Sequence, residues 1–335
     1  MRLFGFGSNQ LPVNGKTVLI TGGSEGMGRS AAIQLAKKGA NVVIVSRSRE
    51  KLAAAIADIE SAALNPDKQR FHYISADLTN TSDAERIIEE TTQWNNGVPP
   101  DVVWCCAGFC HPGFFIDVPI RTLRAQMDTV YWTAAYTAHA TLRRWLAPVA
   151  PGSSSTASSP RHLIFTASIL SFWPLAGYGP YAPAKAAMRG LADVLVQEIE
   201  MYNGARRNKQ NAAPAADVKI HIVFPMGILS PGFENEQKLK PEVTKIVEGA
   251  DEPQTPDKVA ELAIKGLERG DYQIVTAPLG HLMRGSALGP SPRNNVLFDT
   301  VAALLGSLAA LFAIPDLSGK VFKYGKKKGI PGTGK

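Results

Sequence analysis

Residues 17–28 read TVLITGGSEGMG, in which an apolar run of β-favouring residues leads directly into a turn with four glycines. The residues after Gly28 have helical periodicity. Glycines between a strand and a helix let the backbone turn tightly and approach a ligand, while the helix N-terminus offers unpaired amides to anionic oxygens. The stretch therefore predicts the first strand, turn and helix of a dinucleotide-binding α/β fold.

The same alternation of apolar runs and helical stretches continues through most of the chain. Strands buried on both faces lose the polar alternation of a one-sided sheet, so the pattern predicts a doubly wound parallel sheet of seven strands, a Rossmann-type α/β fold with helices on both faces. The expected strands cover residues 17–20, 42–45, 71–75, 102–106, 162–166, 220–224 and 273–275. The expected helices cover residues 26–38, 49–63, 82–93, 120–147, 180–202 and 256–269.

We expect one large domain with two flanking segments. Residues 14–280 form the domain, residues 1–13 a short N-terminal extension, and residues 281–335 a C-terminal segment. Two low-complexity stretches, residues 151–160 and 203–216, follow long predicted helices. Both are interpreted as mobile surface insertions.

The C-terminal segment contains a strongly apolar run, VLFDTVAALLGSLAALFAI, at residues 296–314. As a helix this run would extend about 28 Å, close to the roughly 30 Å hydrocarbon core of a bilayer. It predicts a short transmembrane or re-entrant helix, with Asp299 in the headgroups and the lysines beyond it facing the cytoplasm. The alternative is an amphipathic helix packed against the domain or a partner subunit.

The charge pattern favours a membrane surface over nucleic acid. The chain has a net charge of +7, and much of the excess follows residue 315, where six lysines accompany Asp316 as the only acidic residue. A basic tail beside an apolar helix is typical of a juxtamembrane segment. Residues 1–10 hold too short an apolar stretch for a secretory signal peptide.

Cysteine and histidine patterns argue against a disulfide framework and a metal site. The three cysteines, Cys105, Cys106 and Cys110, lie in or just after one apolar run and are interpreted as small, buried, reduced residues of a cytosolic domain. The chain has no histidine pair at metal-ligand spacing and no Cys-x-x-Cys, so we expect no metal.

The second expected strand predicts which nicotinamide cofactor is preferred. It ends VVIVSRSR at residues 42–49, with Arg47 where an acidic residue would bind a ribose 2′-hydroxyl. A guanidinium suits a 2′-phosphate, which favours NADPH over NADH; the alternative is a solvated arginine. Asp77 ends the third strand and is a candidate acceptor for the adenine amine. The expected cofactor contacts are Gly22, Ser24, Glu25, Gly26, Gly28, Arg47, Asp77, Leu78, Tyr181 and Lys185.

Three residues form a candidate catalytic set. YAPAK at residues 181–185 places the phenol of Tyr181 and the ammonium of Lys185 four residues apart on one helix face. A nearby ammonium favours the phenolate, which would ease proton transfer by the tyrosine. Ser168 follows the fifth strand and is suited to donate a hydrogen bond to the same carbonyl oxygen.

The order and spacing of TGGSEGMG, Asp77, Ser168 and YAPAK resemble the short-chain dehydrogenase/reductase family. The resemblance covers roughly residues 14–280 and implies an NADPH-binding catalytic domain. It implies that hydride passes to a ketone carbon, that Tyr181 protonates the oxygen and that Ser168 orients it. It further implies that Lys185 holds the nicotinamide ribose.

Two departures from the family pattern put parts of this assignment in question. Where the family usually has Asn-Asn-Ala-Gly, residues 105–108 read CCAG. Where the family has a fourth catalytic residue, an asparagine that helps to hold a relay water largely through its main-chain carbonyl, this chain has Val130.

Narrower features resemble the membrane-bound branch of the family that reduces 3-ketosphingoid bases. They are PMGILSPGFENE at residues 225–236 and SPRNN at residues 291–295. The resemblance implies reduction of 3-ketodihydrosphingosine to dihydrosphingosine with NADPH on the cytosolic face of the endoplasmic reticulum membrane. A long-chain substrate needs an apolar opening, and residues 227–248 are a candidate lid. Candidates for the opening are Phe114, Phe115, Phe172, Trp173, Leu175 and Phe233.

Other functions and an assembly state stay open. One alternative is reduction of another hydrophobic ketone, such as a steroid or a 3-ketoacyl thioester. Another is a non-catalytic NADP-binding scaffold, which the departures at Cys105 and Val130 would suit. In the family, the counterparts of helices 120–147 and 180–202 form dimers or tetramers, so the resemblance implies a homo-oligomer.

Overall fold

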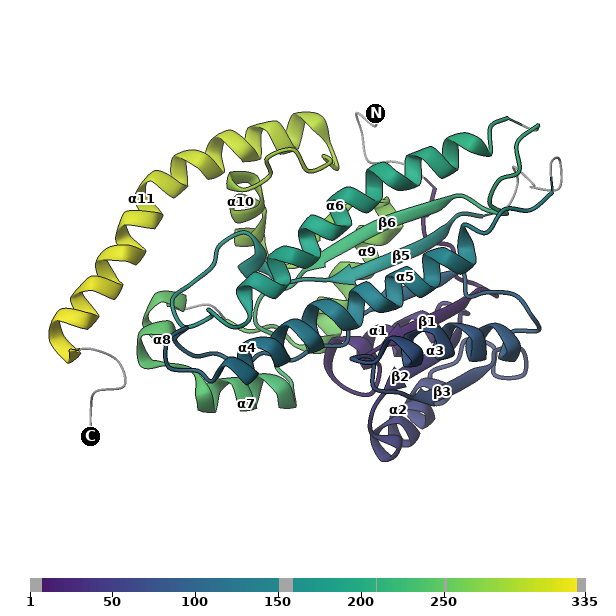
Figure 1. The fold of residues 1–335 in the computed structure, drawn as a ribbon, viewed down its shortest axis with the longest axis horizontal. Coiled ribbons are helices and arrows are strands. Elements are labelled where there is room, and N and C mark those ends of the chain that lie inside the picture. The colour runs from purple at the N-terminus through teal and green to yellow at the C-terminus, as the bar shows by residue number, and fades with distance from the viewer. Residues whose placement is uncertain (1–7, 151–158, 209, 250–251, 330–335) are drawn as a thin grey trace.

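Seven parallel strands form one sheet in the order β3-β2-β1-β4-β5-β6-β7 (Figure 1). The computed structural model describes residues 8–150, 159–208, 210–249 and 252–329. The strands agree with the expected ones within two residues at each end, which confirms the doubly wound fold. They are β1 (Thr17–Thr21), β2 (Asn41–Ser46), β3 (Phe71–Ser75), β4 (Val102–Cys105), β5 (Arg161–Thr166), β6 (Val218–Phe224) and β7 (Gln273–Val275).

Helices cover both faces of the sheet because successive strand residues point to opposite sides. In β1, Val18 and Ile20 pack with α1, α2 and α9, whereas Leu19 packs with α3, α5 and α6. All three side chains are fully buried. The covering helices are α1 (Gly26–Ala36), α2 (Arg49–Ser61), α3 (Thr81–Trp94), α5 (Thr133–Trp145), α6 (Ala182–Ala205) and α9 (Pro256–Arg269).

The helix expected over residues 120–147 contains a π-helical segment. It is divided into α4 (Ile120–Gln126), the π-helix η1 (Met127–Trp132) and α5. Val130 is buried within η1. π segments inside helices occur frequently at functional sites, and this one places Val130 next to Gly108 of the loop after β4.

Three short helices were not expected from the sequence. They are α7 (Pro231–Leu239), α8 (Glu242–Glu248) and α10 (Pro278–Ser286). α7 begins after Ser230, whose hydroxyl accepts a hydrogen bond from the amide of Phe233 at 3.2 Å. None of the residues of α7 is fully buried, so no continuous apolar stripe marks the helix. The expected domain boundary at residue 280 falls inside α10.

The expectation of a surface insertion at residues 203–216 is wrong at its two ends, which belong to the domain, whereas residues 207, 208 and 210–212 between them are exposed. α6 continues to Ala205, and the next residue, Arg206, is only 2% exposed. Its guanidinium pairs with Asp217 and donates to the carbonyl of Pro214 at 2.9 Å. Burying a guanidinium requires such partners, so they fix the segment to the domain. Most of the other expected insertion, residues 151–158, lies outside the described residues.

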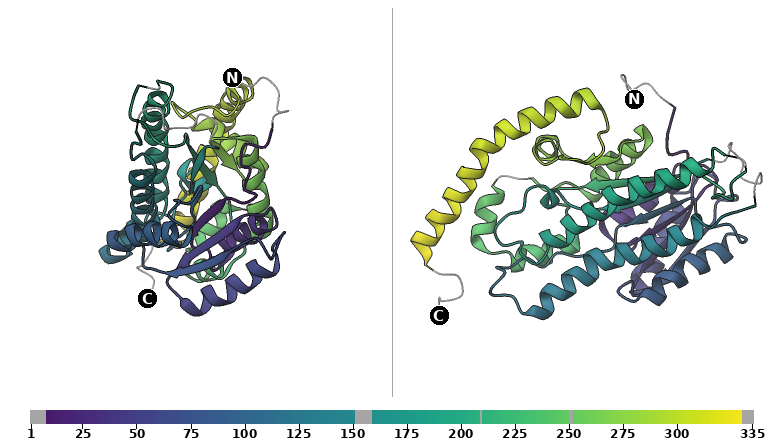
Figure 2. Two further views of the ribbon diagram at one scale, coloured as in Figure 1. Left: turned by 90° about the vertical axis from the view of Figure 1, so that its right-hand side faces the viewer. Right: turned by 45° about the horizontal axis from the view of Figure 1, so that its top comes forward.

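The apolar run near the C-terminus belongs to a helix that is much longer than expected. α11 (Val296–Lys328) has 33 residues and arches away from the sheet (Figures 1 and 2). Its first half packs on α10, and near its end Tyr324 and Lys328 contact Glu242 of α8. Its most apolar 18-residue window has a mean hydropathy of 2.0 and is only 17% buried. Within the described ranges it is the one helix long and apolar enough to cross a membrane.

Two glycines let α10 and α11 cross at backbone contact. A β-carbon on Gly285 would overlap the carbonyl oxygen of Ala302, and one on Gly306 would overlap that of Leu282. The crossing also buries an ion pair between Arg284 and Asp299, whose side chains are 2% and 0% exposed. The expectation that Asp299 lies among lipid headgroups is therefore wrong, because its carboxylate is bound inside the protein.

We expect Asp299→Asn to destabilise the protein by about 3 kcal/mol, because it leaves the buried guanidinium of Arg284 without a counter-charge. Thermal unfolding of the detergent-solubilised protein measures the loss, and limited proteolysis between α10 and α11 reports release of the helix. Asp316→Asn removes the exposed ion pair with Lys320 and is the matched control, with little effect. Equal unfolding temperatures for the two variants would contradict the structural role of Asp299.

Candidate active site

One large cavity lies at the carboxyl edge of the sheet. It has a volume of about 1000 Å³ and is lined by the loops after β1 to β6 and by parts of α7, α8, α10 and α11. Ligands of open α/β sheets bind at this edge, where the strand order reverses, here between β1 and β4. The residues expected from the sequence to hold the cofactor or carry the catalysis all line the cavity: Gly22, Ser24, Glu25, Gly26, Gly28, Arg47, Asp77, Leu78, Ser168, Tyr181 and Lys185.

The turn after β1 is too tight for side chains at two of its glycines. Gly22 has a φ of +67°, and a β-carbon there would lie 2.8 Å from the backbone of Ala107. A β-carbon on Gly28 would overlap the carbonyl oxygen of Gly22. α1 begins at Gly26, and no side chain caps its first amides. A cradle of glycine backbone at a helix N-terminus fits the pyrophosphate of a dinucleotide.

Arg47 and Asp77 lie where the ends of β2 and β3 meet the cavity. Arg47 is exposed, and its carbonyl accepts a hydrogen bond from the hydroxyl of Ser75 at 3.0 Å. The carboxylate of Asp77 accepts bonds from the hydroxyl and the amide of Thr79, at 2.8 and 3.2 Å. The structure therefore brings both residues to the adenosine side of the expected dinucleotide, although their roles stay predictions.

Thr166, the last residue of β5, holds the site together. Its carbonyl accepts a 2.6 Å bond from the ammonium of Lys185, which is 5% exposed. Its hydroxyl accepts a bond from the indole of Trp104 at 3.0 Å and donates to the sulfur of Cys106 at 3.4 Å. Burial lowers the pKa of Lys185 to about 8, although Cys106 and Cys110 act in the opposite direction. Thr166 was not identified from the sequence, because a threonine at a strand end carries no distinctive signal.

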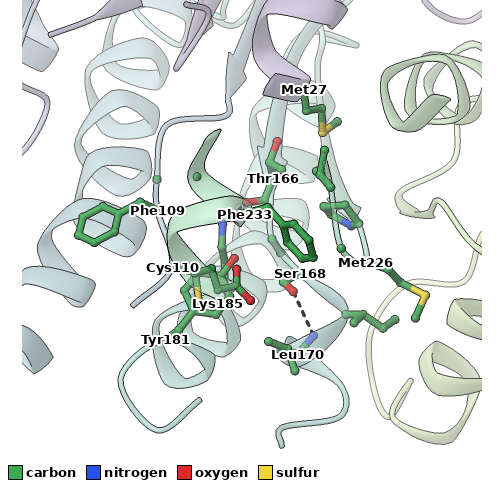
Figure 3. A pocket seen from close by; sticks show the side chains of 18 of the residues that line it. Met27, Phe109, Cys110, Thr166, Ser168, Leu170, Tyr181, Lys185, Met226 and Phe233 are labelled. Atoms are coloured by element: carbon green, nitrogen blue, oxygen red, sulfur yellow. Dashed lines mark hydrogen bonds between the residues drawn. The ribbon is translucent and has the colours of Figure 1, made fainter. Parts of the chain in front are cut away.

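Ser168 and Tyr181 lie together in the cavity. The hydroxyl of Ser168 accepts a 3.2 Å bond from the amide of Leu170 (Figure 3). Ser168 also lies close enough to Tyr181 for its side chain to act on the phenol. Tyr181 directly precedes α6, and the turn that follows places Lys185 beside it, with its ammonium 5.7 Å from the centre of the phenol ring.

The pKa of Tyr181 is well above its usual value. Burial is the main cause, and Cys110 and Glu236 act in the same direction, while the nearby side chain of Ser168 opposes them. We expected the ammonium of Lys185 to favour the phenolate. That expectation stays a prediction: the ammonium is bound to the carbonyl of Thr166 and lies 5.7 Å from the centre of the phenol ring. A phenol with a raised pKa stays protonated, which suits a proton donor.

The three cysteines are free thiols, but only one is a plain core residue. Cys105 is buried in β4, whereas Cys106 and Cys110 line the cavity. Figure 3 shows Cys110 in the same part of the cavity as Lys185 and Tyr181. Burial raises the pKa of Cys106 to about 12, so the thiol stays neutral. The expectation of plain buried residues is therefore wrong for Cys106 and Cys110.

α7 and α8 border the cavity and are held by a cluster that sequence reasoning missed. The hydroxyl of Tyr178 donates to Glu236 at 2.6 Å and also to Glu248. Lys240, buried among them, donates to Glu248 at 2.8 and 3.0 Å and lies 3.0 Å from Glu236. The four-residue spacing of Glu236 and Lys240 was the available signal. That residues 227–248 move as a lid stays a prediction.

Half of the expected apolar opening lines the cavity. Trp173, Leu175 and Phe233 do so, whereas Phe172 is buried against Phe224 in the core and Phe115 is 64% exposed. Phe114 is also outside the lining. A further apolar wall of the cavity was not expected as part of the site. It consists of Leu279, Leu282 and Met283 of α10 and Gly306, Ala309, Ala313 and Leu317 of α11.

Among the described residues, no group of three or more histidine, cysteine, aspartate or glutamate side chains lies close enough together to hold a metal ion.

Comparison with known proteins agrees with this geometry. The family model described as short chain dehydrogenase matches residues 16–215. The 3-ketodihydrosphingosine reductase ksrA of Aspergillus fumigatus is 59% identical over 333 residues, which are 99% of this chain and 90% of that protein. The 3-ketodihydrosphingosine reductase gsl-3 of Neurospora crassa is 44% identical over 326 residues, which are 97% of this chain and 86% of that protein.

Solved structures share the fold. A short-chain type dehydrogenase/reductase from Mycobacterium ulcerans superposes with a TM-score of 0.61 at 22% identity, over 79% of this chain and 89% of that one. A short chain dehydrogenase/reductase from Burkholderia phymatum, in complex with NAD, superposes with a TM-score of 0.62 at 15% identity. The match covers 80% of this chain and 91% of that one. The chain therefore belongs to the short chain dehydrogenase family, and its similarity to 3-ketodihydrosphingosine reductases extends over nearly its whole length.

Proposed function

We propose that this protein reduces 3-ketodihydrosphingosine to dihydrosphingosine with NADPH, at the cytosolic face of the endoplasmic reticulum membrane. The observation that carries the proposal is a single cavity that joins the glycine turn, the Ser168, Tyr181 and Lys185 set, and an apolar wall on α10 and α11. The names of the relatives supply the substrate. A long-chain ketone with a polar head needs all three parts of this cavity.

Tyr181 is the proton donor in the proposed reaction. The cofactor, when bound, supplies hydride to the ketone carbon. Tyr181 gives its phenolic proton to the ketone oxygen, and its raised pKa keeps that proton in place until the oxygen becomes basic. Ser168 donates a hydrogen bond to the same oxygen, since the bond that it accepts from Leu170 leaves its hydroxyl proton available. Lys185 holds the nicotinamide ribose.

NADPH is the preferred cofactor in this proposal because Arg47 borders the adenosine side of the cavity. Its exposed guanidinium suits the 2′-phosphate that distinguishes NADPH from NADH. No carboxylate follows β2 directly to bind an unmodified ribose, since residues 46–49 read SRSR.

The hydrocarbon chain of the ketone lies along α10 and α11 in this proposal. The residues that α11 gives to the cavity are mostly small, such as Gly306, Ala309 and Ala313. The same helix exposes Leu308 and Leu311 elsewhere on its surface, at 50% and 67%. One helix thus has a face for the substrate chain and a face for bilayer lipid, with the lysines at its end near the cytosolic headgroups.

Residues 14–280 carry the chemistry and residues 281–335 the membrane contact in this proposal. The protein assembles as a homodimer or homotetramer through α5 and α6. Exposed apolar side chains on and next to these helices support such an interface: Trp132 is 39% exposed, Val194 51% and Met201 65%.

We expect Tyr181→Phe to reduce kcat for 3-ketodihydrosphingosine by roughly 10²–10⁴-fold, because loss of a general acid costs about that much. Oxidation of NADPH by the protein in detergent measures the rate. An unchanged unfolding temperature serves as the control for folding. Undiminished turnover by the variant would rule out the proposed proton donor.

We expect Arg47→Glu to lower kcat/KM for NADPH by roughly 10–100-fold, because a charged hydrogen bond to the 2′-phosphate is lost and a repulsive charge is introduced. For NADH, kcat/KM of the variant should stay within a few-fold of kcat/KM of the unaltered protein. Steady-state assays with both cofactors give the ratio. A parallel loss with both cofactors would contradict a role in discriminating between them.

We expect Ala313→Trp to raise KM for the long-chain ketone roughly tenfold, because overfilling a packed apolar wall is costly. Leu311→Trp, at an exposed position of the same helix outside the cavity, is the matched control and should change KM little. Assays with a short-chain analogue test the cause, since its reduction should survive in both variants. Equal KM values for the two tryptophan variants would contradict the proposal that the hydrocarbon chain lies along α10 and α11.

A further inference from the structure

The cluster that holds α7 and α8 contains an unbalanced negative charge. Two carboxylates, Glu236 and Glu248, share one ammonium, that of Lys240, and one neutral phenol, that of Tyr178. The side chains of Lys240, Glu236 and Glu248 are 1%, 15% and 25% exposed. Negative charge in so sheltered a place is costly without a further partner. Within the cluster, the two carboxylates have only one ammonium between them, so one negative charge has no opposite charge.

Lys240 makes more bonds to Glu248 than to Glu236. It bonds to both oxygens of Glu248, at 2.8 and 3.0 Å, and approaches one oxygen of Glu236 at 3.0 Å. The same oxygen of Glu236 accepts the bond from Tyr178. Glu236 is therefore the carboxylate that can accept a further hydrogen bond, through its other oxygen.

Glu236 also faces the reacting part of the cavity. Its carboxylate accepts a 2.6 Å bond from the hydroxyl of Tyr178, and the centre of the Tyr178 ring lies 6.3 Å from that of Tyr181. Both Cys110 and Tyr181 line the cavity with it. Glu248 lines the cavity as well, but both of its oxygens bind Lys240, and one of them also binds Tyr178. The contacts of Glu236 with Tyr178 and Lys240 both go to a single oxygen, so the two glutamates differ in their bonding although they share one cluster.

We propose that Glu236 binds the ammonium of the substrate and selects ketones with an amino group on the neighbouring carbon. The inference rests on the proposed function and deepens it. In a 2-amino-3-ketone, one bond separates the two carbons that carry the ammonium and the carbonyl oxygen. A group that binds the ammonium must therefore lie close to the residue that protonates the oxygen, as Glu236 does relative to Tyr181. The ammonium supplies the positive charge that the cluster lacks.

This arrangement connects binding with proton transfer. A carboxylate near Tyr181 makes loss of the phenolic proton harder, since two negative charges would then lie close together. The ammonium of a bound 2-amino ketone offsets that carboxylate at the moment when Tyr181 must release its proton. A ketone without the amino group gives no such compensation. Glu236 is therefore expected to affect kcat as well as KM.

The test compares two ketones in three forms of the full-length protein with NADPH. The ketones are 3-ketodihydrosphingosine and 1-hydroxyoctadecan-3-one, which lacks the amino group. The proteins are the unaltered chain, Glu236→Gln and Glu248→Gln. Glutamine keeps the size of the side chain and an oxygen for Tyr178 and Lys240, so it removes charge alone. The readout is the ratio of kcat/KM for the amino ketone to that for its counterpart.

We expect the unaltered protein to prefer the amino ketone by on the order of 10- to 100-fold, the range for a hydrogen bond between charged groups. Glu236→Gln should abolish most of that preference, whereas Glu248→Gln should keep it. The role of Glu236 would be overturned if the ratio of kcat/KM values were the same in Glu236→Gln as in the unaltered protein. It would also be overturned if the ratio fell equally in Glu236→Gln and Glu248→Gln. Either result would leave the proposed function intact. Reduction of neither ketone by the unaltered protein would overturn both.

Discussion

A buried ammonium must have an oxygen to bind, and this requirement organises the centre of the molecule. The ammonium of Lys185 is bound to the carbonyl of Thr166, and the hydroxyl of Thr166 connects to Trp104 and Cys106. Through these bonds the ends of β4 and β5 and the start of α6 hold one another in position. Ser168 and Tyr181 then follow from β5 and precede α6 at fixed points, so their proximity depends on the same contacts.

The sequence was sufficient for features that depend on local patterns. The glycines of residues 22–28, the strands and the spacing of Tyr181 and Lys185 each reflect a short-range constraint: a tight turn, burial on both faces, or one helix face. The features it could not predict arise from pairs of residues far apart in the chain. From its place in the apolar run, Asp299 was expected at the edge of a membrane. In the structure it forms a buried ion pair with Arg284, because α10 and α11 cross closely at Gly285 and Gly306.

The same distinction explains what was missed in the active site. Tyr178 lies in a loop before α6, whereas Glu236 and Glu248 lie on helices that follow β6, and no periodicity links them. Their association places acidic groups near Tyr181, the proposed proton donor, whose pKa is already raised by burial. The proposed reaction sets two opposed requirements, since Tyr181 would have to keep its proton before hydride transfer and release it during the reaction.

The cavity extends along the carboxyl edge of the sheet, from the glycine turn after β1 to the apolar wall of α10 and α11. One region borders the water-facing ends of β2 and β3, and the other borders a helix whose surface is suited to lipid. In the proposed function, two reactants with opposite solubilities would therefore enter the cavity from different sides. The hydride donor would come from water and the ketone from lipid, so neither would have to dissolve in the other's surroundings.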